Sequence, residues 1–359
     1  MNKTDMAKKN LREFVNEIDA KLEKYWNSEI SHNFGFNNKQ KALVEKILLH
    51  SKEHNLRTAK RVRGAFTYYA YRLSGKDSDD KIWQACMALE LVHTALLMHD
   101  DFMDQDIIRR GKPTTQKYFA ENADDHYGES MAVTTGDVVL CLGFELLNNC
   151  GFEPQNIQKA MKKMLRGIAE TAYGQAYDVT LEKLSKDWEE EDVISVHKAK
   201  TSIYTYENPL FIGAYLADVP QDVFSILHDY SMDGGVAFQL QDDILGIFGN
   251  AEKTGKSSDS DLLQGKCTLL VMRVMSHGTN DHKNSLLKVW GKRKASRNDI
   301  DMAKKAIIES GSLDYSKKIS REFAQKAASS AQKLRGRKLN PESIDFLEGI
   351  AQYMVEREL

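Results

Sequence analysis

The chain has 359 residues, with 52 acidic and 50 basic side chains. A chain of this length can bury a full core, as one large domain or as two ordinary ones. The near balance of charge excludes the global basic field that is typical of nucleic-acid-binding proteins, so we predict no nucleic acid partner. Any site for phosphate must therefore come from local clusters of basic residues.

Cysteine usage and hydropathy indicate the compartment. The four cysteines are scattered, without the short paired spacings of a zinc site or the density of a secreted disulfide scaffold. No apolar signal core follows the charged start, and no apolar run approaches the ~18 residues of a membrane span. Even residues 138–147 are too short. The sequence predicts a soluble, cytoplasmic protein with no transmembrane segment, and leaves contact with a membrane surface open.

Secondary structure is predicted to be mostly helical, because only five prolines interrupt the chain. Apolar residues recur every three or four positions from Leu11 to Tyr25, which predicts an amphipathic first helix. A basic segment, TAKRVRG, follows at residues 58–64. Its Lys60 and Arg63 are spaced i, i+3 and would share a helical face. Taken alone, the segment is equally typical of a solvated helix start.

An apolar helix then runs through Leu89, Val92 and Met98 into a strongly acidic end. The carboxylates are Asp100, Asp101, Asp104 and Asp106, and basic residues Arg109, Arg110 and Lys112 follow them. Asp100 and Asp104 are spaced i, i+4, so they project from one face. Such a cluster is costly unless cations neutralise it, and Mg²⁺ is typically held by one or two carboxylates plus substrate phosphates. The segment predicts a site for a magnesium-bound diphosphate, with a solvated helix cap as the alternative.

The middle of the chain carries further polar residues in apolar helices. We expect one helix over about 130–148, in which Asp137 needs a partner, and another over about 156–184. Gln175 and Asp178 share a face of the second and are either core hydrogen-bonding groups or cavity-lining groups. The next helix presents Lys200 and Thr201 before Pro209 kinks or breaks it.

The acidic pattern returns about 140 residues later, over residues 233–270. An apolar helix presents Phe238, Gln239, Asp242 and Asp243, and the loop and short segments after it contain Lys256, Asp259, Asp261 and Lys266. Two such helices, each followed by basic residues, are hard to explain as two solvated caps. No linker divides the chain, so we predict a single domain over residues 1–359, with a motif-bearing core at about 55–275, an N-terminal helix within 1–40 and C-terminal helices over 276–359.

These motifs together resemble those of the trans-isoprenyl diphosphate synthases, the polyprenyl synthetase family, over about residues 60–270. They are KRVR at Lys60–Arg63, His93, DDFMD at Asp100–Asp104, RRGKPT at Arg109–Thr114, KT at Lys200–Thr201, FQLQDD at Phe238–Asp243, GK at Lys256, SDL at Asp261 and GK at Lys266. Three features depart from the usual family pattern. Gly246 stands where a third aspartate often occurs, Ala59 and Gly64 replace a glycine and a proline, and two residues separate the aspartates of the first motif instead of four.

The resemblance implies an all-α helical bundle of the isoprenoid synthase type with a central apolar cavity, and it implies a homodimer. It also implies head-to-tail (1'-4) condensation of isopentenyl diphosphate with an allylic prenyl diphosphate. About three Mg²⁺ ions would be held by Asp100, Asp101, Asp104 and Asp242. Arg109, Lys200, Thr201, Lys256 and Lys266 would contact the allylic diphosphate, and Lys60, Arg63, His93 and Arg110 would hold isopentenyl diphosphate. Phe238 and Gln239 would lie near the reacting carbons and exclude water.

Product length should depend on what blocks the tunnel below the first motif. Ala95 and Leu96 lie roughly 6 to 8 Å from Asp100 along the helix, or one to two isoprene units deep. Because neither is aromatic, and because Val92 one turn deeper is also modest in size, we predict geranylgeranyl diphosphate, with Phe144 as one candidate for the tunnel floor. Farnesyl and longer polyprenyl products stay open. A terpene cyclase and a non-catalytic partner subunit are the remaining alternatives.

Overall fold

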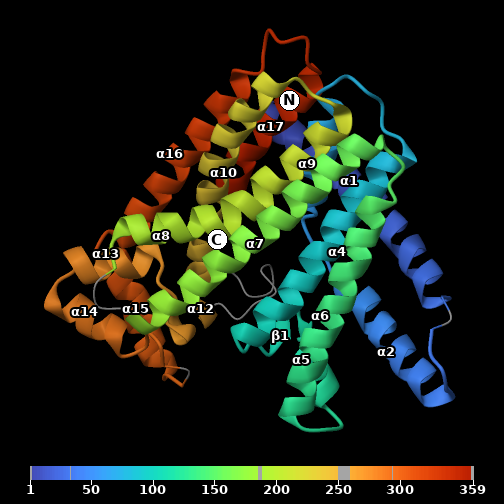
Figure 1. Cartoon of the computed structure of the whole chain (residues 1–359). Helices are drawn as coiled ribbons and strands as arrows, with labels where there is room; N and C mark the ends of the chain where they lie inside the picture. The colour runs from blue at the N-terminus through green and yellow to red at the C-terminus, as the bar shows by residue number, and fades with distance from the viewer. Residues whose placement is uncertain (1, 33, 185–187, 250–258, 293, 357–359) are drawn as a thin grey trace. The chain divides into compact units, whose positions relative to one another are not determined.

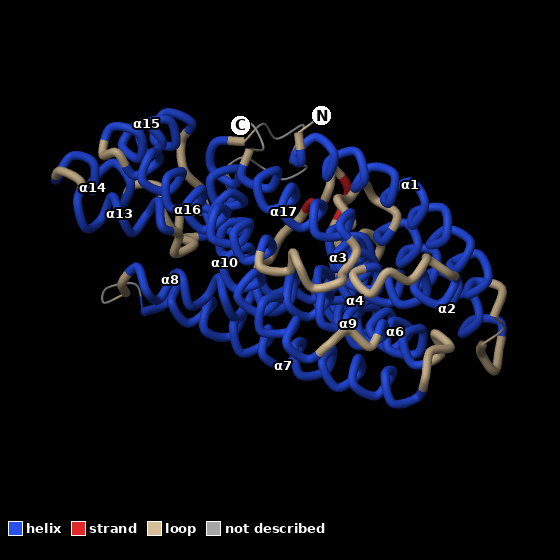
Figure 2. The backbone as a smooth tube through the Cα atoms, turned by 90° about the horizontal axis from the view of Figure 1, so that it is seen from above, coloured by secondary structure: helices blue, strands red, loops and turns tan. Residues whose placement is uncertain are grey.

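The structure is a computed structural model that describes residues 2–32, 34–184, 188–249, 259–292 and 294–356. Within these ranges, helices joined by loops make up the backbone, with one short pair of antiparallel strands (Figures 1 and 2). The predicted all-α fold is confirmed. Lys256, which we predicted to contact diphosphate, lies outside the described residues.

The elements follow one another with short connections. In chain order they are α1 (Lys3–Ile30), α2 (Asn38–Asn55), α3 (Val62–Arg72), α4 (Asp80–Met103), β1 (Ile108–Arg109), β2 (Lys112–Pro113), α5 (Thr115–Ala120), α6 (Asp125–Asn148), α7 (Pro154–Leu184), α8 (Glu190–Val196), η1 (His197–Glu207), α9 (Asn208–Ala217), α10 (Gln221–Phe248), α12 (Ser260–Gln264), α13 (Leu269–His277), α14 (Asn280–Leu287), α15 (Arg297–Glu309), α16 (Ser312–Gln332) and α17 (Pro341–Val355).

Residue contacts divide the chain into two compact units, each assembled from separate stretches of sequence. We call the unit formed by Lys9–Met161 and Ile212–Val219 the N-unit. The C-unit consists of Met1–Lys8, Lys162–Phe211 and Pro220–Leu359. Because helices α1, α7 and α9 contribute residues to both, the chain passes between the units several times. The predicted single domain stays a prediction.

Helix α4 organises the N-unit. It packs against α2, α3, α5 and α6, and Figure 1 shows α4 and α6 running side by side. Two glycines of α6 permit this close approach: a Cβ on Gly143 would clash with Val92, and one on Gly136 would clash with the ring of His99. The first acidic motif therefore stands at the end of a helix that is fixed along its length.

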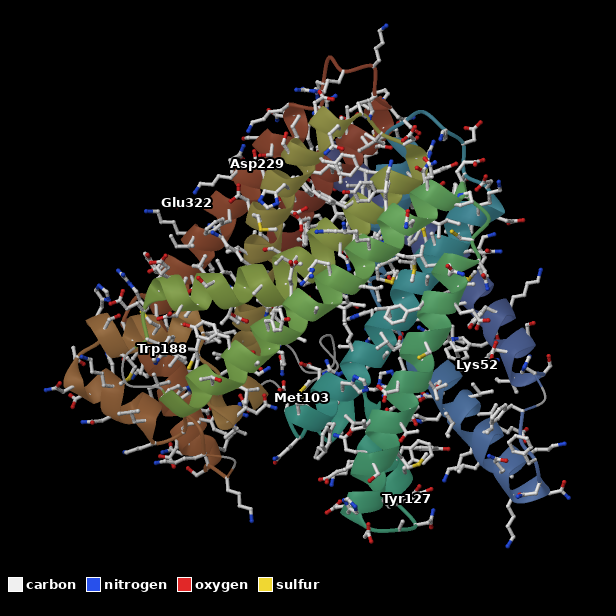
Figure 3. All side chains as sticks on the ribbon, viewed as in Figure 1. Lys52, Met103, Tyr127, Trp188, Asp229 and Glu322 are labelled. Carbon is white, nitrogen blue, oxygen red and sulfur yellow. The ribbon has the colours of Figure 1, made fainter. Side chains whose placement is uncertain are left out.

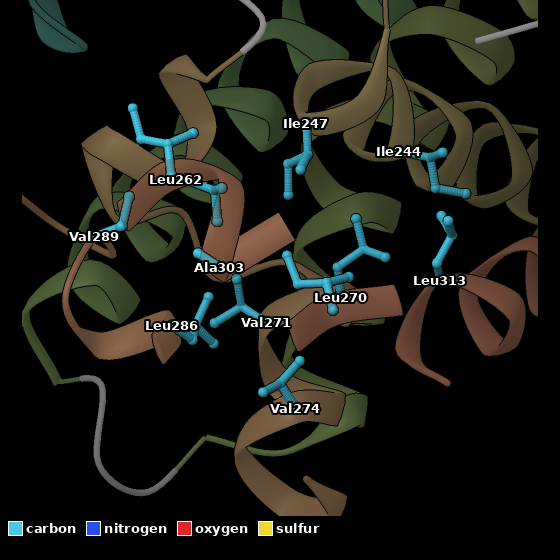
Figure 4. Packing of buried hydrophobic residues seen from close by; sticks show 12 residues of the cluster. Ile244, Ile247, Leu262, Leu270, Val271, Val274, Leu286, Val289, Ala303 and Leu313 are labelled. Atoms are coloured by element: carbon cyan, nitrogen blue, oxygen red, sulfur yellow. The ribbon is translucent and has the colours of Figure 1, made fainter. Parts of the chain in front are cut away.

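Helix α10 has the same role in the C-unit. It packs against α16, α17 and η1, and Gly235 lets it approach η1 so closely that a Cβ there would clash with the backbone of Ser202. A buried apolar cluster joins the end of α10 to α12, α13, α14, α15 and the start of α16 (Figure 4). It contains Ile244, Ile247, Leu262, Leu270, Val271, Val274, Leu286, Val289, Ile300, Ala303, Ile307 and Leu313. The second acidic motif is thus also held by a packed core.

The helix that we predicted around Lys200 has an unexpected geometry. Residues His197–Glu207 form a π-helix, which continues α8 and is followed without a break by α9. Pro209 is the second residue of α9, so it stands where the π-helical geometry changes to α-helical geometry and does not end the helix. A π-helix of this length is rare, and such segments occur frequently at functional sites.

One helix in the described part of the chain, α6, is long and apolar enough to cross a membrane by length and composition. Core helices of soluble proteins pass the same test, and α6 packs against α4 and α5. Only 39% of its most apolar window is buried, however. The run over residues 138–147, which we judged too short for a membrane span, is thus part of a longer apolar helix.

Candidate active site

The first acidic motif ends α4, with Asp104 as its C-cap residue. Asp100 and Asp104 are partly exposed, whereas Asp101 is completely buried. Met103, the last residue of the helix, is labelled in Figure 3, and its side chain is 47% exposed. Since only one face of the helix end packs on the protein, the three predicted metal ligands are in two different environments.

Asp101 is held by Arg109. The guanidinium donates from Nε to Oδ1 of Asp101 at 2.7 Å and donates to the same oxygen from a terminal nitrogen. Although burial acts to raise it, the pKa of Asp101 lies below its ordinary value because of Arg109 and His54. The same guanidinium lies 3.6 Å from Asp100 and 3.5 Å from Asp106. Arg109, which we predicted to contact substrate, therefore binds the acidic motif itself.

A tight hairpin places Arg109 there. β1 pairs with β2 so that Arg109 lies opposite Lys112, and the two residues between them both have positive φ, 52° at Arg110 and 75° at Gly111. This is the pattern of a two-residue turn that suits the twist of a hairpin. Glycine adopts it readily, but for an arginine it is strained. The turn directs consecutive arginines to different partners.

Two residues that sequence analysis missed support the site, His54 near the end of α2 and Arg57 just after that helix. Arg57 donates to the backbone oxygens of Arg109 and Pro113, each at 3.0 Å. The ring of His54 is buried with its Nε2 3.9 Å from Asp101, and burial lowers its pKa in spite of that carboxylate. No local motif marks His54 or Arg57, because they come from the end of α2 and the residues just after it, about 45 residues before the site.

The predicted isopentenyl diphosphate site forms a cluster of cations in the N-unit. Arg63 donates to Nε2 of His93 at 3.0 Å. Burial, followed by Arg63 and Arg110, lowers the pKa of His93 well below its usual value, so the ring is neutral. Burial and then Arg61 lower the pKa of Arg110 to about 10. Lys60 is exposed beside them. Arginines held this close together form a site suited to a multiply charged anion.

The residues predicted to limit chain length differ in their exposure on α4. Leu96, one turn before Asp100, is partly exposed, whereas Ala95 and Val92 are completely buried. Val92 faces α6, where Gly143 leaves room for it. Of the three residues, Leu96 is the one that shares the Asp100 side of the helix.

The second acidic motif repeats the arrangement of the first. Asp242 is partly exposed, whereas Asp243 is buried, accepts a hydrogen bond from Gln239 at 2.9 Å and lies 3.1 Å from His197. Gln239 in turn accepts from Thr201 at 2.7 Å. In both motifs, therefore, the first aspartate of the pair is accessible and the second is held by neighbouring side chains.

Other predicted residues in the C-unit also have partners there. Lys200 of η1 donates to Asp178 of α7 at 3.0 Å, so Asp178 is a hydrogen-bonding group of this lysine. Phe238 packs edge to face on Tyr206, with 6.1 Å between ring centroids. Lys266 lies 3.7 Å from the carboxylate of Asp261. The C-unit thus brings together η1, α7, α10 and the segment after α12.

The chemistry of the donors suits Mg²⁺, because every candidate ligand is a hard carboxylate oxygen. Among the described residues, no group of three or more His, Cys, Asp or Glu side chains is arranged to hold a metal by itself. Asp100 and Asp104 lie in the N-unit, and Asp242 lies in the C-unit. The paired spacing of Asp100 and Asp104 fits an ion that takes most of its ligands from phosphate and water.

Comparison with known proteins identifies the family. Residues 45–307 match the sequence profile of the polyprenyl synthetases. The chain belongs to the polyprenyl synthetase family. Among characterised members, it is 31% identical to the geranylgeranyl diphosphate synthase of Saccharolobus solfataricus over 94% of this chain and 98% of that one. It is 33% identical to that of Methanosarcina mazei, over 83% of this chain and 86% of the other.

Solved structures of this family share the fold. The geranylgeranyl pyrophosphate synthetase of the archaeon Geoglobus acetivorans is 26% identical, with a TM-score of 0.75 over 95% of this chain and all of that one. A geranylgeranyl pyrophosphate synthase from Corynebacterium glutamicum, complexed with isoprenyl diphosphate and magnesium, is 22% identical with a TM-score of 0.85 over the whole of both chains. The second likeness concerns the fold alone.

Proposed function

We propose that this polyprenyl synthetase condenses isopentenyl diphosphate head to tail with an allylic diphosphate, and that its main product is geranylgeranyl diphosphate. The observation that carries the proposal is that each unit presents an acidic helix segment and that the N-unit also holds a separate cluster of cations. The carboxylates suit a metal-bound diphosphate leaving group, and the cations suit a second diphosphate. The relatives named geranylgeranyl diphosphate synthase support the same reaction.

In this proposal, the accessible and the buried aspartates of each acidic motif have different roles. Asp100, Asp104 and Asp242 are the accessible carboxylates and would hold Mg²⁺, which when bound stabilises charge on the departing diphosphate. Asp101 and Asp243 are buried and paired, so they would orient Arg109 and Gln239 beside those ligands. Since the buried carboxylates hold Arg109 and Gln239 in place, these neighbours of the metal ligands need little rearrangement during the reaction, which favours preorganised charge stabilisation.

The remaining residues would bind, position and shield the substrates. Lys60, Arg63, His93 and Arg110 would hold isopentenyl diphosphate, with neutral His93 offering an N–H donor to a phosphate oxygen. Lys200 and Lys266 would contact the allylic diphosphate, and Lys256 is proposed from the sequence alone. Phe238 and Gln239 would keep water from the allylic cation. No side chain is proposed as the final base, which leaves the released diphosphate as the proton acceptor.

We further propose a cytoplasmic homodimer that uses α6. The helix has a mean hydropathy of 1.5 over its most apolar window, most of which is not buried. Tyr127, labelled in Figure 3, and Val133 are 40% and 41% exposed. Apolar side chains that a helix leaves incompletely buried, as α6 does at Leu140 and Phe144, are typical of an interface. Light scattering after gel filtration tests this: V133D should yield monomers, and a wild-type monomer would contradict the proposal.

Mass spectrometry of reaction products tests the proposed activity. Purified protein is incubated with Mg²⁺, isopentenyl diphosphate and, separately, dimethylallyl, geranyl or farnesyl diphosphate, with the double variant D100A/D101A as control. We expect a product of twenty carbons that requires Mg²⁺ and is absent from the control. A fifteen-carbon product would retain the reaction and refute the product length. A cyclic hydrocarbon, or no elongation, would refute the reaction and favour a cyclase or a partner subunit.

A further inference from the structure

Arg61, which stands between the two predicted diphosphate-binding residues Lys60 and Arg63, is buried and unusually placed. Its backbone has φ 49° and ψ 34°, in the left-handed region, and it caps the start of α3. For a residue with a Cβ this conformation is strained and persists only where the surroundings fix it. Lys60 before it is exposed, and Arg63 after it is partly exposed. The strained turn therefore determines how the two flanking cations are presented.

Three acceptors from three different segments fix the guanidinium of Arg61. Its Nε donates to Asp19 of α1 at 2.8 Å, and its terminal nitrogens donate to the backbone oxygen of Asn55 at 2.7 Å and to Glu90 of α4 at 3.3 Å. The side chains of Arg61 and Glu90 are each only 2% exposed. Because a planar guanidinium offers donors in a fixed fork, this set of acceptors specifies one orientation.

Glu90 also binds the backbone of the same turn. Its second oxygen accepts the N–H of Gly64 at 2.9 Å, so one carboxylate joins the side chain of Arg61 to the first turn of α3. Asn55 is fixed in turn, since its side-chain amide donates to Thr94 at 2.7 Å and accepts from the indole of Trp26 at 2.9 Å. The turn is thereby attached to α4 three residues before His93, itself part of the predicted site.

We infer that Arg61 and Glu90 are positioning residues, which hold the left-handed turn so that Lys60 and Arg63 converge with His93 on the diphosphate of isopentenyl diphosphate. This inference rests on the proposed function. Neither side chain is accessible enough to contact the substrate itself. Their loss should weaken binding of isopentenyl diphosphate specifically, because the allylic diphosphate is assigned to other residues.

The test compares conservative variants of the pair. R61K keeps the positive charge but cannot reach three acceptors, and E90Q keeps the shape of the side chain but places a donor in a site that needs two acceptors. We expect each to raise the KM for isopentenyl diphosphate about tenfold or more, with the KM for farnesyl diphosphate changed less than about threefold. The double variant should be little worse than either single variant, since both disrupt one unit.

A matched control separates positioning from general stability. Glu348 in the C-unit is also a buried glutamate bound by an arginine, Arg335. E348Q should therefore lower the melting temperature as E90Q does and leave the KM for isopentenyl diphosphate unchanged. If R61K and E90Q leave that KM unchanged, or raise both KM values equally, the inference is wrong. R61K provides the comparison if E90Q does not fold.

Calorimetric titration of isopentenyl diphosphate without divalent metal distinguishes failure of the inference from failure of the proposed function. Wild-type protein that binds isopentenyl diphosphate but turns over no allylic substrate would refute the function, and weaker binding by R61K and E90Q would still support the inference. Protein that binds no isopentenyl diphosphate would refute both.

Discussion

The carboxylate of Asp261 occupies the space that a Cβ on Gly246 would need. Gly246 is the position of α10 at which related sequences often have a third aspartate, and Asp261 belongs to α12. The side chain of Asp261 is only 12% exposed and lies 3.7 Å from Lys266. The missing aspartate is thus matched by a carboxylate from a neighbouring segment.

This relationship predicts that restoring the aspartate is harmful. G246D should lower activity and raise the Mg²⁺ concentration needed for half-maximal rate, because the new Cβ displaces Asp261 and adds a like charge beside it. G246A, which adds the Cβ alone, should cost about 1–3 kcal/mol of unfolding free energy. The measurements are a Mg²⁺ titration of the rate and urea unfolding. A lower Mg²⁺ requirement in G246D would contradict the prediction.

The contrast between Asp100 and Asp101 predicts different defects for substitutions at adjacent positions. D101N leaves buried Arg109 without its main charged partner, so it should lower the unfolding free energy by about 3 kcal/mol. D100N should change it by less than about 0.5 kcal/mol, because this side chain is partly exposed. D100N should instead lower turnover at least about a hundredfold. Urea unfolding without metal and steady-state rates check both, and equal losses of stability would refute the distinction.

Acid stability should depend on His50, a buried residue of α2 whose Nε2 lies 3.0 Å from the hydroxyl of Thr115. Burial, followed by His54, lowers the pKa of His50 to about 3. Between that value and the ordinary pKa of about 6.5, the unfolded chain binds a proton that the folded chain does not. Stability therefore falls as the pH drops from about 6.5 towards 3, by up to about 1.4 kcal/mol per pH unit from this group.

H50Q checks this contribution. The variant should show a shallower loss of unfolding free energy between pH 7 and pH 5 than the wild type, by up to one proton. H126Q, at an exposed position of α6, is the matched control and should keep the wild-type slope. Urea unfolding at several pH values measures both, and parallel curves for H50Q and wild type would exclude a role for His50.

Product length should respond most cleanly to Leu96. L96F places an aromatic ring on the Asp100 side of α4 at a partly exposed position, so it should shift the main product from twenty carbons to fifteen with little loss of stability. A95F should shorten the product as well, but overpacking a fully buried position should cost about 1–3 kcal/mol. Product analysis beside thermal unfolding tests both. An unchanged product in L96F would disprove the assignment of the tunnel to this face.

Some of this architecture could be predicted from sequence, because it follows from periodicity. The apolar repeats of α4 and α10 predict helices, and the i, i+4 spacing of Asp100 and Asp104 predicts their common face. The burial of Asp101 and Asp243 could not be predicted, since adjacent residues on a helix point in different directions and only the packing decides which one is covered. His54 depends in the same way on the packing of a helix far away in sequence.

The basic segment at residues 58–64 could also be predicted only in part from the sequence. Its charges predicted an anion site, but the left-handed backbone of Arg61 depends on acceptors supplied by α1, α4 and the end of α2, which no local motif encodes. The departure at Gly64 was interpreted as a change of loop shape. The structure shows in addition that its N–H donates to Glu90, which a proline at this position could not do.

The π-helix η1 makes the spacing of this stretch as important as its composition. A π-helix accommodates one more residue per turn than an α-helix, and each residue of an α-helix turns the chain by about 100°. Removing a residue between His197 and Thr201 would therefore turn one of them relative to the other by about 100°, so that they could no longer contact Asp243 and Gln239 together. An insertion or deletion within η1 can therefore change which of its side chains contact α10, although every residue of the motif on α10 stays the same.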